Sequence, residues 1–161
     1  MTTNPAPLIR PAESGDAPLI VDYNLRLADE SEGLKLDRAR VERGVRRLLE
    51  APRHGVYYIA EVDGQAVGQL MLTREWSDWR DGAFWWIQSV YVDAAFRRRG
   101  VFAALYGHVA AQAAADPDVC GLRLYVETDN AAAQATYRRQ GMQLTAYRVM
   151  EATELADVGQ P

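Results

Sequence analysis

The sequence is most informative between Val90 and Tyr106, where it reads VYVDAAFRRRGVFAALY. An apolar segment typical of a β-strand leads into a basic turn, and an alanine-rich stretch typical of a helix follows. The N–H groups in the first turn of a helix lack intrahelical partners, and the helix dipole is positive at that end. This turn therefore resembles a phosphate site, in which Gly100 would let the backbone approach the ligand.

Three adjacent arginines in this turn would add positive charge and donors that suit phosphate oxygens. They are Arg97, Arg98 and Arg99. Such a triplet is also common in a solvated surface turn, so the motif needs support from the rest of the chain. That support lies downstream, where residues 119–126 read as a second strand and residues 131–140 as a helix that ends at Gly141.

Together these segments resemble the GNAT N-acetyltransferase superfamily, whose members move an acetyl group from acetyl-CoA to an amine. The resemblance covers residues 56–150. The pyrophosphate loop of the superfamily reads Arg/Gln-x-x-Gly-x-Gly/Ala and is matched by residues 97–102, except that Phe102 stands where a small residue is usual. The second signature is matched, in the superfamily's order and spacing, by Asn130, Ala133, Tyr137, Gly141 and Met142.

The resemblance implies acetyl-CoA as the acetyl donor and assigns residues to it. The backbone of Val90, Tyr91 and Val92 would bind the pantetheine arm, although these residues also suit a plain sheet core. The pyrophosphate would lie on Arg97, Arg98, Arg99, Gly100, Val101, Phe102 and Ala103. Asn130 would contact the cofactor or cap its helix. Tyr137 would contact the cofactor and act as the general acid that protonates the departing thiolate, its alternative role being that of a buried helix aromatic.

An alkylammonium acceptor has a pKa of about 10.4 and must lose a proton before it attacks. Many members of the superfamily carry an acidic residue on the strand before the pyrophosphate loop, but residues 84–89, FWWIQS, contain none. The sequence therefore leaves the general base open. The candidates are Glu75, Asp78, Asp81 and Glu127, each of which also reads as a solvated loop carboxylate.

The four tryptophans all fall between Glu75 and Ile87. Aromatic rings beside carboxylates suit a cationic amine through cation–π attraction and charge pairing. The expected substrate-binding residues are Glu75, Trp76, Trp79, Trp86 and Gln88. The alternative is that these rings pack the sheet or a dimer interface, where aromatics are enriched.

Hydrophobic periodicity and turn residues predict one domain over residues 1–161, with a core at about 7–150 and a flexible tail at 151–161. The resemblance implies that it is an N-acetyltransferase domain. The fold class is α/β of the α+β type, a single-domain GNAT fold whose mixed, mostly antiparallel central sheet is flanked by helices. Strands are expected at residues 7–10, 55–62, 65–75, 83–92, 119–126 and 142–150. Helices are expected after Asp16, from Asp37 to Glu50, and at 100–115 and 131–140, with a polar loop at 29–35.

The 161 residues contain 18 lysines and arginines against 22 acidic residues, which gives a net charge of −4 and argues against a nucleic-acid binder. One cysteine, Cys120, and two distant histidines give no metal-binding spacing. No segment resembles a signal peptide or a membrane span, so a cytoplasmic protein that binds neither membrane nor metal is expected. Dimers are common in the superfamily, which leaves a homodimer open.

The predicted function is acetyl-CoA-dependent N-acetylation of a primary amine, a small cationic amine in the first instance, by direct transfer. Three alternatives stay open. The chain could acetylate a protein amine, or bind acyl-CoA as a regulator without catalysis, since the strand acid is missing and Phe102 departs from the motif. A nucleic-acid-binding module built on the arginine triplet is the third, and the acidic balance of the chain opposes it.

Overall fold

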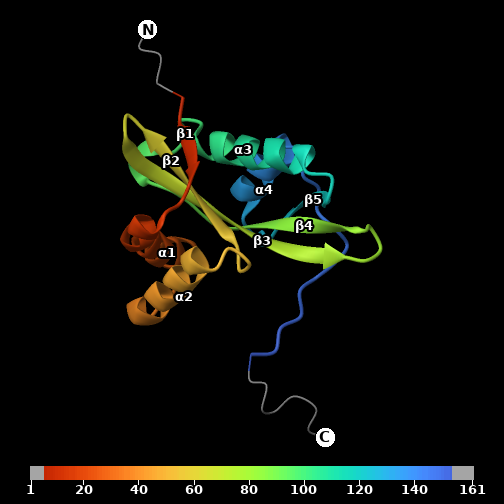
Figure 1. Ribbon diagram of the computed structural model, residues 1–161, viewed down its shortest axis with the longest axis horizontal. Helices are drawn as coiled ribbons and strands as arrows, with labels where there is room; N and C mark the ends of the chain where they lie inside the picture. The colour runs from red at the N-terminus through yellow and green to blue at the C-terminus, as the bar shows by residue number, and fades with distance from the viewer. Residues whose placement is uncertain (1–5, 154–161) are drawn as a thin grey trace, which may run out of the picture. The chain divides into compact units, whose positions relative to one another are not determined.

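The computed structural model describes residues 6–153 of the chain (Figure 1). It comprises two compact units, residues 1–125 and residues 126–161, and each is described by itself. The first unit holds a five-stranded mixed sheet in the order β1-β2-β3-β4-β5. Its strands are β1 (Leu8–Pro11), β2 (Val56–Val62), β3 (Gln65–Ser77), β4 (Gly82–Val92) and β5 (Val119–Leu124).

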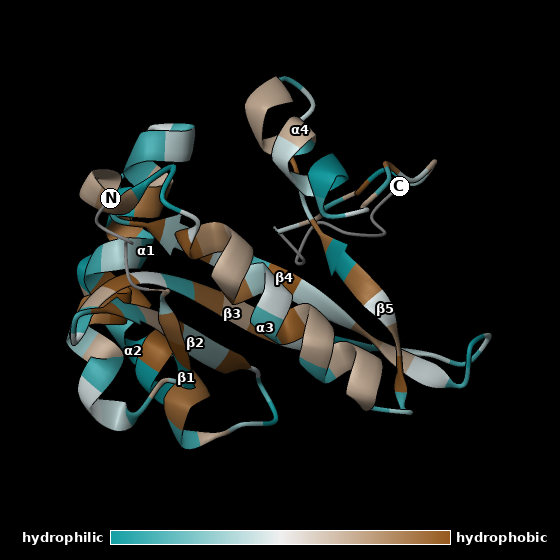
Figure 2. Cartoon of the chain, turned by 90° about the horizontal axis from the view of Figure 1, so that it is seen from above, coloured by the Kyte–Doolittle hydropathy of each residue, from teal (hydrophilic) through white to brown (hydrophobic). Residues whose placement is uncertain are grey.

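The first four strands pair antiparallel, and β5 joins β4 in parallel. Helix α3 (Val101–Ala115) makes the connection between β4 and β5, because parallel neighbours need a long crossover. Helices α1 (Ala17–Glu32) and α2 (Arg38–Glu50) cover the opposite face of the sheet from α3 (Figure 1). Figure 2 shows the apolar strands lying beneath α3, as expected for a sheet that is buried on both faces.

Local sequence rules account for several of the element boundaries. The Asp37 carboxylate caps α2 by accepting a hydrogen bond from the Ala39 N–H at 3.0 Å. Asp63 and Gly64 have φ values of 51° and 75°, the left-handed pair that a two-residue hairpin requires. Helix α1 continues to Glu32 through the predicted polar loop and ends at Gly33, which adopts the left-handed conformation with φ 65°.

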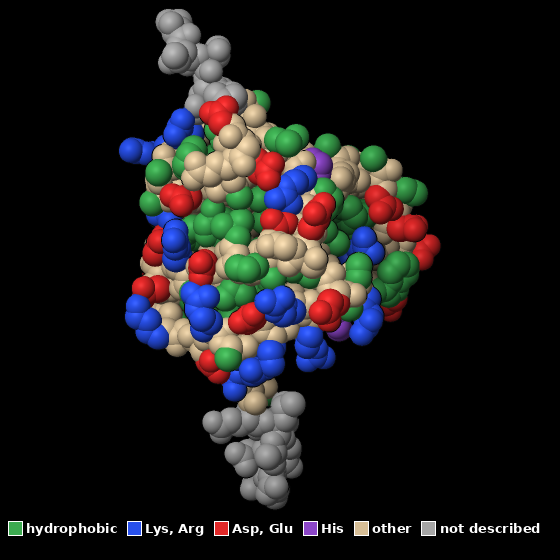
Figure 3. Space-filling model, turned by 60° about the vertical axis from the view of Figure 1, so that its left-hand side comes forward, with side chains coloured by type: hydrophobic (Ala, Val, Ile, Leu, Met, Phe, Trp, Pro, Cys, Tyr) green, Lys and Arg blue, Asp and Glu red, His purple; other side chains and the backbone are tan. Residues whose placement is uncertain are grey.

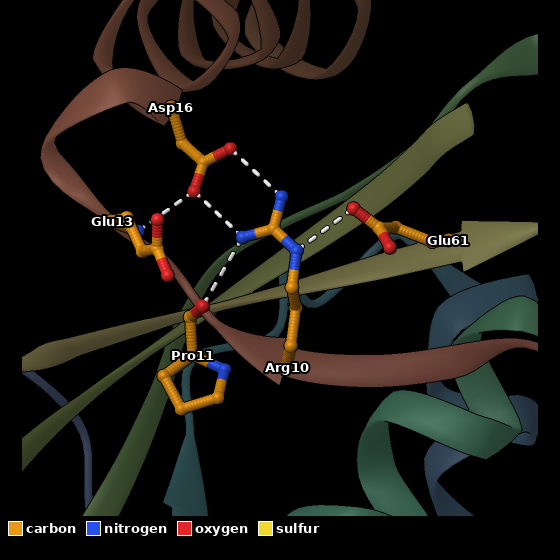
Figure 4. A network of polar contacts seen from close by, with 5 residues as sticks. All are labelled: Arg10, Pro11, Glu13, Asp16 and Glu61. Atoms are coloured by element: carbon orange, nitrogen blue, oxygen red, sulfur yellow. Dashed lines mark hydrogen bonds and ion pairs between the residues drawn. The ribbon is translucent and has the colours of Figure 1, made fainter. Parts of the chain in front are cut away.

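One row of paired residues crosses the face of the sheet that α1 covers. In it Arg10 pairs with Ile59, Ile59 with Gln69, and Gln69 with Tyr91. Ile59 belongs to the apolar cluster that α1 and α2 form with β2. At the edge of the row, Arg10 binds the carboxylates of Asp16 and Glu61 (Figure 4).

The second unit contains α4 (Ala131–Arg139), preceded by a turn at residues 127–130. The strand predicted at residues 142–150 is wrong, because these residues form no regular secondary structure. A strand needs the backbone groups of a neighbouring strand, and residues 126–153 contain no other strand to supply them. The side chains of Leu144, Tyr147, Val149 and Met150 are exposed.

The predicted fold class is confirmed, with helices on both faces of a mixed, mostly antiparallel sheet. The predicted strand at 119–126 is shorter and ends at Leu124. Of the predicted flexible tail, residues 151–153 are exposed without secondary structure, and residues 154–161 lie outside the described residues.

Candidate active site

Strand β4 consists of two different halves. Residues from Ala83 to Ile87 pair with β5 on one side and with β3 on the other. From Gln88 to Val92 the strand pairs with β3 alone, so within the described sheet one edge of its backbone is open. An open strand edge presents unpaired N–H and C=O groups, and these are the groups that an extended ligand arm needs.

A β-bulge marks the start of the open half. Gln69 pairs with Tyr91 and Met71 with Gln88, so two residues of β4, Ser89 and Val90, lie opposite the single residue between them on β3. Ser89 has φ 49°, in the left-handed region that a residue with a side chain rarely adopts. A bulge of this kind leaves backbone groups out of the ladder and bends the strand.

The loop after β4 leads into α3 through a second left-handed backbone. Gly100 has φ 82° and precedes the helix, and its carbonyl accepts a hydrogen bond from Ala104 at 2.9 Å. The open space beside Gly100 would accommodate a Cβ atom, so its backbone conformation is what favours glycine there. The helix dipole is positive at this N-terminal end of α3, which makes this end suited to an anion.

The three arginines of the loop have different surroundings. Arg97 forms an ion pair with Glu30 near the end of α1 and donates to the carbonyl of Val92 at 2.9 Å. The Tyr91 hydroxyl donates to the same Glu30 carboxylate at 2.9 Å. The hydrogen bond between Arg97 and Glu30 is the main cause that lowers the pKa of Glu30, and it also raises the pKa of Arg97.

The other two arginines have surroundings of their own. The guanidinium of Arg99 lies 4.9 Å from the centre of the Phe96 ring, and Arg98 is exposed with φ 59°. The loop therefore holds one arginine paired with α1, one that lies against Phe96, and one that is exposed.

An aromatic and charged cluster covers the outer part of the same sheet face as α1. Trp86 Nε1 donates to the Glu75 carboxylate, and Arg123 lies 3.3 Å from that carboxylate. The Arg123 guanidinium stacks 3.6 Å above the Phe84 ring, and Tyr125 packs on Trp86 with ring centres 4.5 Å apart. Phe84, Trp86 and Arg123 of this cluster lie where β4 and β5 are still paired, before the bulge.

The expected substrate residues are only partly brought together. Glu75 and Trp86 bond directly, and Gln88 lies two residues along the same strand face, where its Nε2 donates to Thr73. Trp76 alternates to the opposite face, and Trp79 sits in the β3–β4 turn with 86% of its surface exposed. Arg123 and Tyr125 were not predicted, although the alternation of residues 122–125 places them on the face opposite Leu122 and Leu124.

The candidate bases have other roles in the described part of the chain. Glu75 is engaged by Trp86 and Arg123. The Asp78 carboxylate accepts from the Trp79 N–H, and Asp81 holds a turn with φ 48°. Glu127 is exposed, and its carbonyl accepts from Gln134.

In the second unit, Asn130 caps α4. Its Oδ1 accepts a hydrogen bond from the Ala133 N–H at 3.0 Å, one of the two roles the sequence suggested. Gly141, with φ 85°, ends the helix by donating to the carbonyl of Arg138. Burial raises the pKa of Tyr137, which keeps its hydroxyl protonated at neutral pH.

The residues of the first unit fit an extended anionic ligand such as acetyl-CoA. Backbone groups at the open edge of β4 suit its amide-bearing arm, and the N-terminus of α3 with Gly100 suits its pyrophosphate. Among residues 6–153, no cluster of histidine, cysteine or acidic side chains could hold a metal ion. The same residues include no helix with the length and apolarity needed to cross a membrane.

Comparison with known proteins now places this architecture. The family model of the Acetyltransferase (GNAT) family matches residues 23–142. The chain belongs to this family, as the two signatures indicated.

Among solved structures, a possible acetyltransferase from Clostridium difficile 630 is 41% identical, with 92% of this chain and 97% of that chain covered and a TM-score of 0.86. A predicted acetyltransferase from Clostridium acetobutylicum, solved with acetyl-CoA, is 18% identical, with coverages of 93% and 97% and a TM-score of 0.73. An aminoglycoside acetyltransferase from an uncultured soil sample is 18% identical, with coverages of 93% and 100% and a TM-score of 0.70, and these last two likenesses concern the fold alone. No curated protein matches the chain.

Proposed function

We propose that this GNAT acetyltransferase moves the acetyl group of acetyl-CoA directly to the nitrogen of a primary amine. The observation that carries the proposal is the open edge of β4. It begins at the bulge and leads, over a few residues, to the start of α3, whose N-terminal dipole suits an anion. An arm bound along this edge, with its pyrophosphate at α3, would place its acyl end at the bulge.

In the proposed reaction the neutral amine attacks the thioester carbon, a C–N bond forms, and the C–S bond breaks. The amine gives up one proton to a base or water that the sequence leaves unassigned. The departing thiolate takes a proton from the Tyr137 hydroxyl, which then regains one from solvent. The role of Tyr137 rests on the family signature and on its raised pKa, because a protonated phenol can donate.

The acceptor is proposed to be a small cationic amine. The carboxylate of Glu75 accepts a hydrogen bond from the ring of Trp86, which lies three residues before Ser89 on β4, and this pair would attract an ammonium group. We also propose that the protein is cytoplasmic and binds neither nucleic acid nor a membrane. It would act as a monomer or as a homodimer. On the face in Figure 3, basic and acidic side chains are interspersed. A nucleic-acid-binding surface needs clustered basic side chains, so this mixture supports a protein that does not bind nucleic acid.

A regulator that binds acyl-CoA without catalysis is the second candidate, because the Glu75 carboxylate is already engaged by Arg123 and Trp86. A protein N-acetyltransferase is the third. Both would use the same open edge of β4. They differ from the first proposal only in what, if anything, receives the acetyl group.

The test is calorimetric titration with acetyl-CoA, followed by an assay for released CoA thiol. The acceptor panel contains diamines, polyamines, amino acids, aminoglycosides and peptides with a free N-terminus or lysine. Binding with turnover on one amine class supports the enzyme, and turnover on peptides alone supports the protein acetyltransferase. Binding without turnover on any acceptor favours the regulator, and no binding overturns all three.

Tyr137→Phe tests the general acid. We expect turnover to fall about 100-fold with acetyl-CoA affinity unchanged, since one positioned proton donor contributes about 10²–10⁴-fold. Tyr147→Phe is the matched control, because Tyr147 is an exposed tyrosine of the same unit. Equal turnover in the two variants would remove Tyr137 from this role.

A further inference from the structure

Gln69 lies in the middle of β3 and is fully buried, although its side chain is polar. Its Nε2 donates to Asn24 Oδ1 on α1 at 2.8 Å and to the carbonyl of Ser89 on β4 at 3.1 Å. Its Oε1 is buried and has no hydrogen-bond partner among the described residues. An unpaired buried acceptor is unfavourable, so packing alone would favour an apolar side chain here.

The amide of Gln69 is part of a network that surrounds the bulge. Asn24 Nδ2 donates to the Tyr57 hydroxyl at 3.0 Å, so α1 and β2 are joined to the network. Hydrogen bonds to Asn24 and Ser89 favour the ionised form of Tyr57, but burial is the larger effect and raises its pKa. Tyr57 therefore stays a neutral hydrogen-bonding group at physiological pH.

The network meets the backbone at its most strained point on β4. Ser89 combines a left-handed φ of 49° with the register shift of the bulge. A non-glycine residue keeps such a conformation only when its surroundings hold it there. The bond from Gln69 Nε2 to the Ser89 carbonyl supplies that restraint from the buried side of the strand.

We infer that Gln69 is a positioning residue for acyl transfer. It holds the Ser89 carbonyl, and with it the bulge, in the orientation that directs the neighbouring backbone N–H groups toward the open edge of β4. An acetyl carbonyl at that edge would accept a hydrogen bond from them as negative charge develops on its oxygen. This inference rests on the proposed function.

The first test compares Gln69→Met with Gln112→Met. Methionine keeps the length of the side chain and removes both the donor and the unpaired acceptor. Gln112 is the matched control because it is another glutamine with a side-chain hydrogen bond, in which its Oε1 accepts from the Tyr58 hydroxyl on the opposite face of the sheet. For Gln69→Met we expect kcat to fall about 10- to 100-fold while the Kd of acetyl-CoA stays within about threefold, and for Gln112→Met we expect neither to change.

The second variant, Gln69→Glu, adds a pH profile. Burial raises the pKa of a carboxyl group, and only its protonated form can donate to the Ser89 carbonyl. The ratio of variant to wild-type kcat should therefore rise as the pH falls. A flat ratio would contradict a role that depends on this donor.

Hydrogen exchange at the amides of residues 88–92, measured without ligand, is independent of catalysis. Gln69→Met should speed exchange there about tenfold or more relative to Gln112→Met, since the bulge loses its restraint. Unchanged exchange would overturn the inference, as would a fall in kcat matched by an equal loss of acetyl-CoA binding. If wild type releases no CoA with any amine, the proposed function fails, and the exchange comparison still decides whether Gln69 holds the bulge.

Discussion

Two of the polar networks that meet α1, one at its start and one at its middle, are built in opposite ways. At the start of the helix, Arg10 bonds Asp16 with both terminal nitrogens and Glu61 with Nε, so each charge has a partner (Figure 4). In the middle of the helix, the network of Asn24, Tyr57, Gln69 and Ser89 is neutral, and one of its acceptors is unpaired.

The difference indicates that the first network stabilises the fold, whereas the second positions the backbone of β4. The first network joins β1 and β2 to the turn before α1 and lies at the edge of the sheet, far along the strand order from β4. The second touches the strained backbone of β4 itself. A charged network in which every group has a partner is expected to contribute only to stability. A network with an unpaired acceptor beside a bulge is less stabilising, but it holds the backbone in one conformation.

The largest effect should come from the residue between the networks. Ile59 pairs with Arg10 on one side and with Gln69 on the other, and it is fully buried. Ile59→Ala should lower the free energy of unfolding by about 2–5 kcal/mol, and Ile59→Val by about 0.5–1.5 kcal/mol. Urea unfolding measures both, with the exposed Leu8→Ala as the control. A loss below about 1 kcal/mol for Ile59→Ala would show that the row is not a shared core.

The stability that the charged network contributes should depend on pH and be lost in acid. The hydrogen bond from Arg10 holds the pKa of Asp16 below its usual value. The ionised carboxylate thus favours the folded state above the unfolded pKa of about 3.9, and this stability is lost as the pH falls through the lower folded pKa. Asp16→Asn should cost about 1–2 kcal/mol at pH 7, and its deficit should vanish at low pH.

Urea midpoints from pH 7 to pH 2 would measure that deficit. Asp22→Asn is the matched control, since Asp22 forms an exposed ion pair with Arg38 and exposed pairs contribute little. If both variants lose the same stability at pH 7, the network of Arg10, Asp16 and Glu61 is no stronger than a surface ion pair. That result would contradict the stabilising role assigned to this network.

The smallest effect concerns strain at the bulge. Ser89→Gly removes the Cβ that opposes a φ of 49°, whereas Ser89→Ala keeps it. Both variants lose the hydroxyl, so their difference reports the backbone. We expect Ser89→Gly to be more stable than Ser89→Ala by about 1 kcal/mol in urea unfolding. Equal stabilities would mean that the bulge stores no strain for Gln69 to oppose.

Much of the fold was predictable because its signals act over a few residues. The Asp63-Gly64 turn between the strands expected at 55–62 and 65–75, the cap at Asp37 where a helix was expected to begin, and the left-handed glycine before α3 all follow from residue type at short spacing. The same holds for the cap at Asn130. The strand predicted at 142–150 shows the limit of this reasoning, because alternation marks a candidate strand and only a neighbouring strand can complete it.

The sequence by itself determined the family, the two signatures and the loop that leads into α3, since these depend on residue type and short spacing. Only the tertiary structure decided that Arg97 bonds Glu30, 67 positions away, that Arg123 reaches Glu75, and that Gln69 holds Ser89. Those contacts depend on strand register and on the point at which β4 stops pairing with β5. Register is a property of the packed sheet as a whole, because each strand is placed by the side chains that it buries against its neighbours.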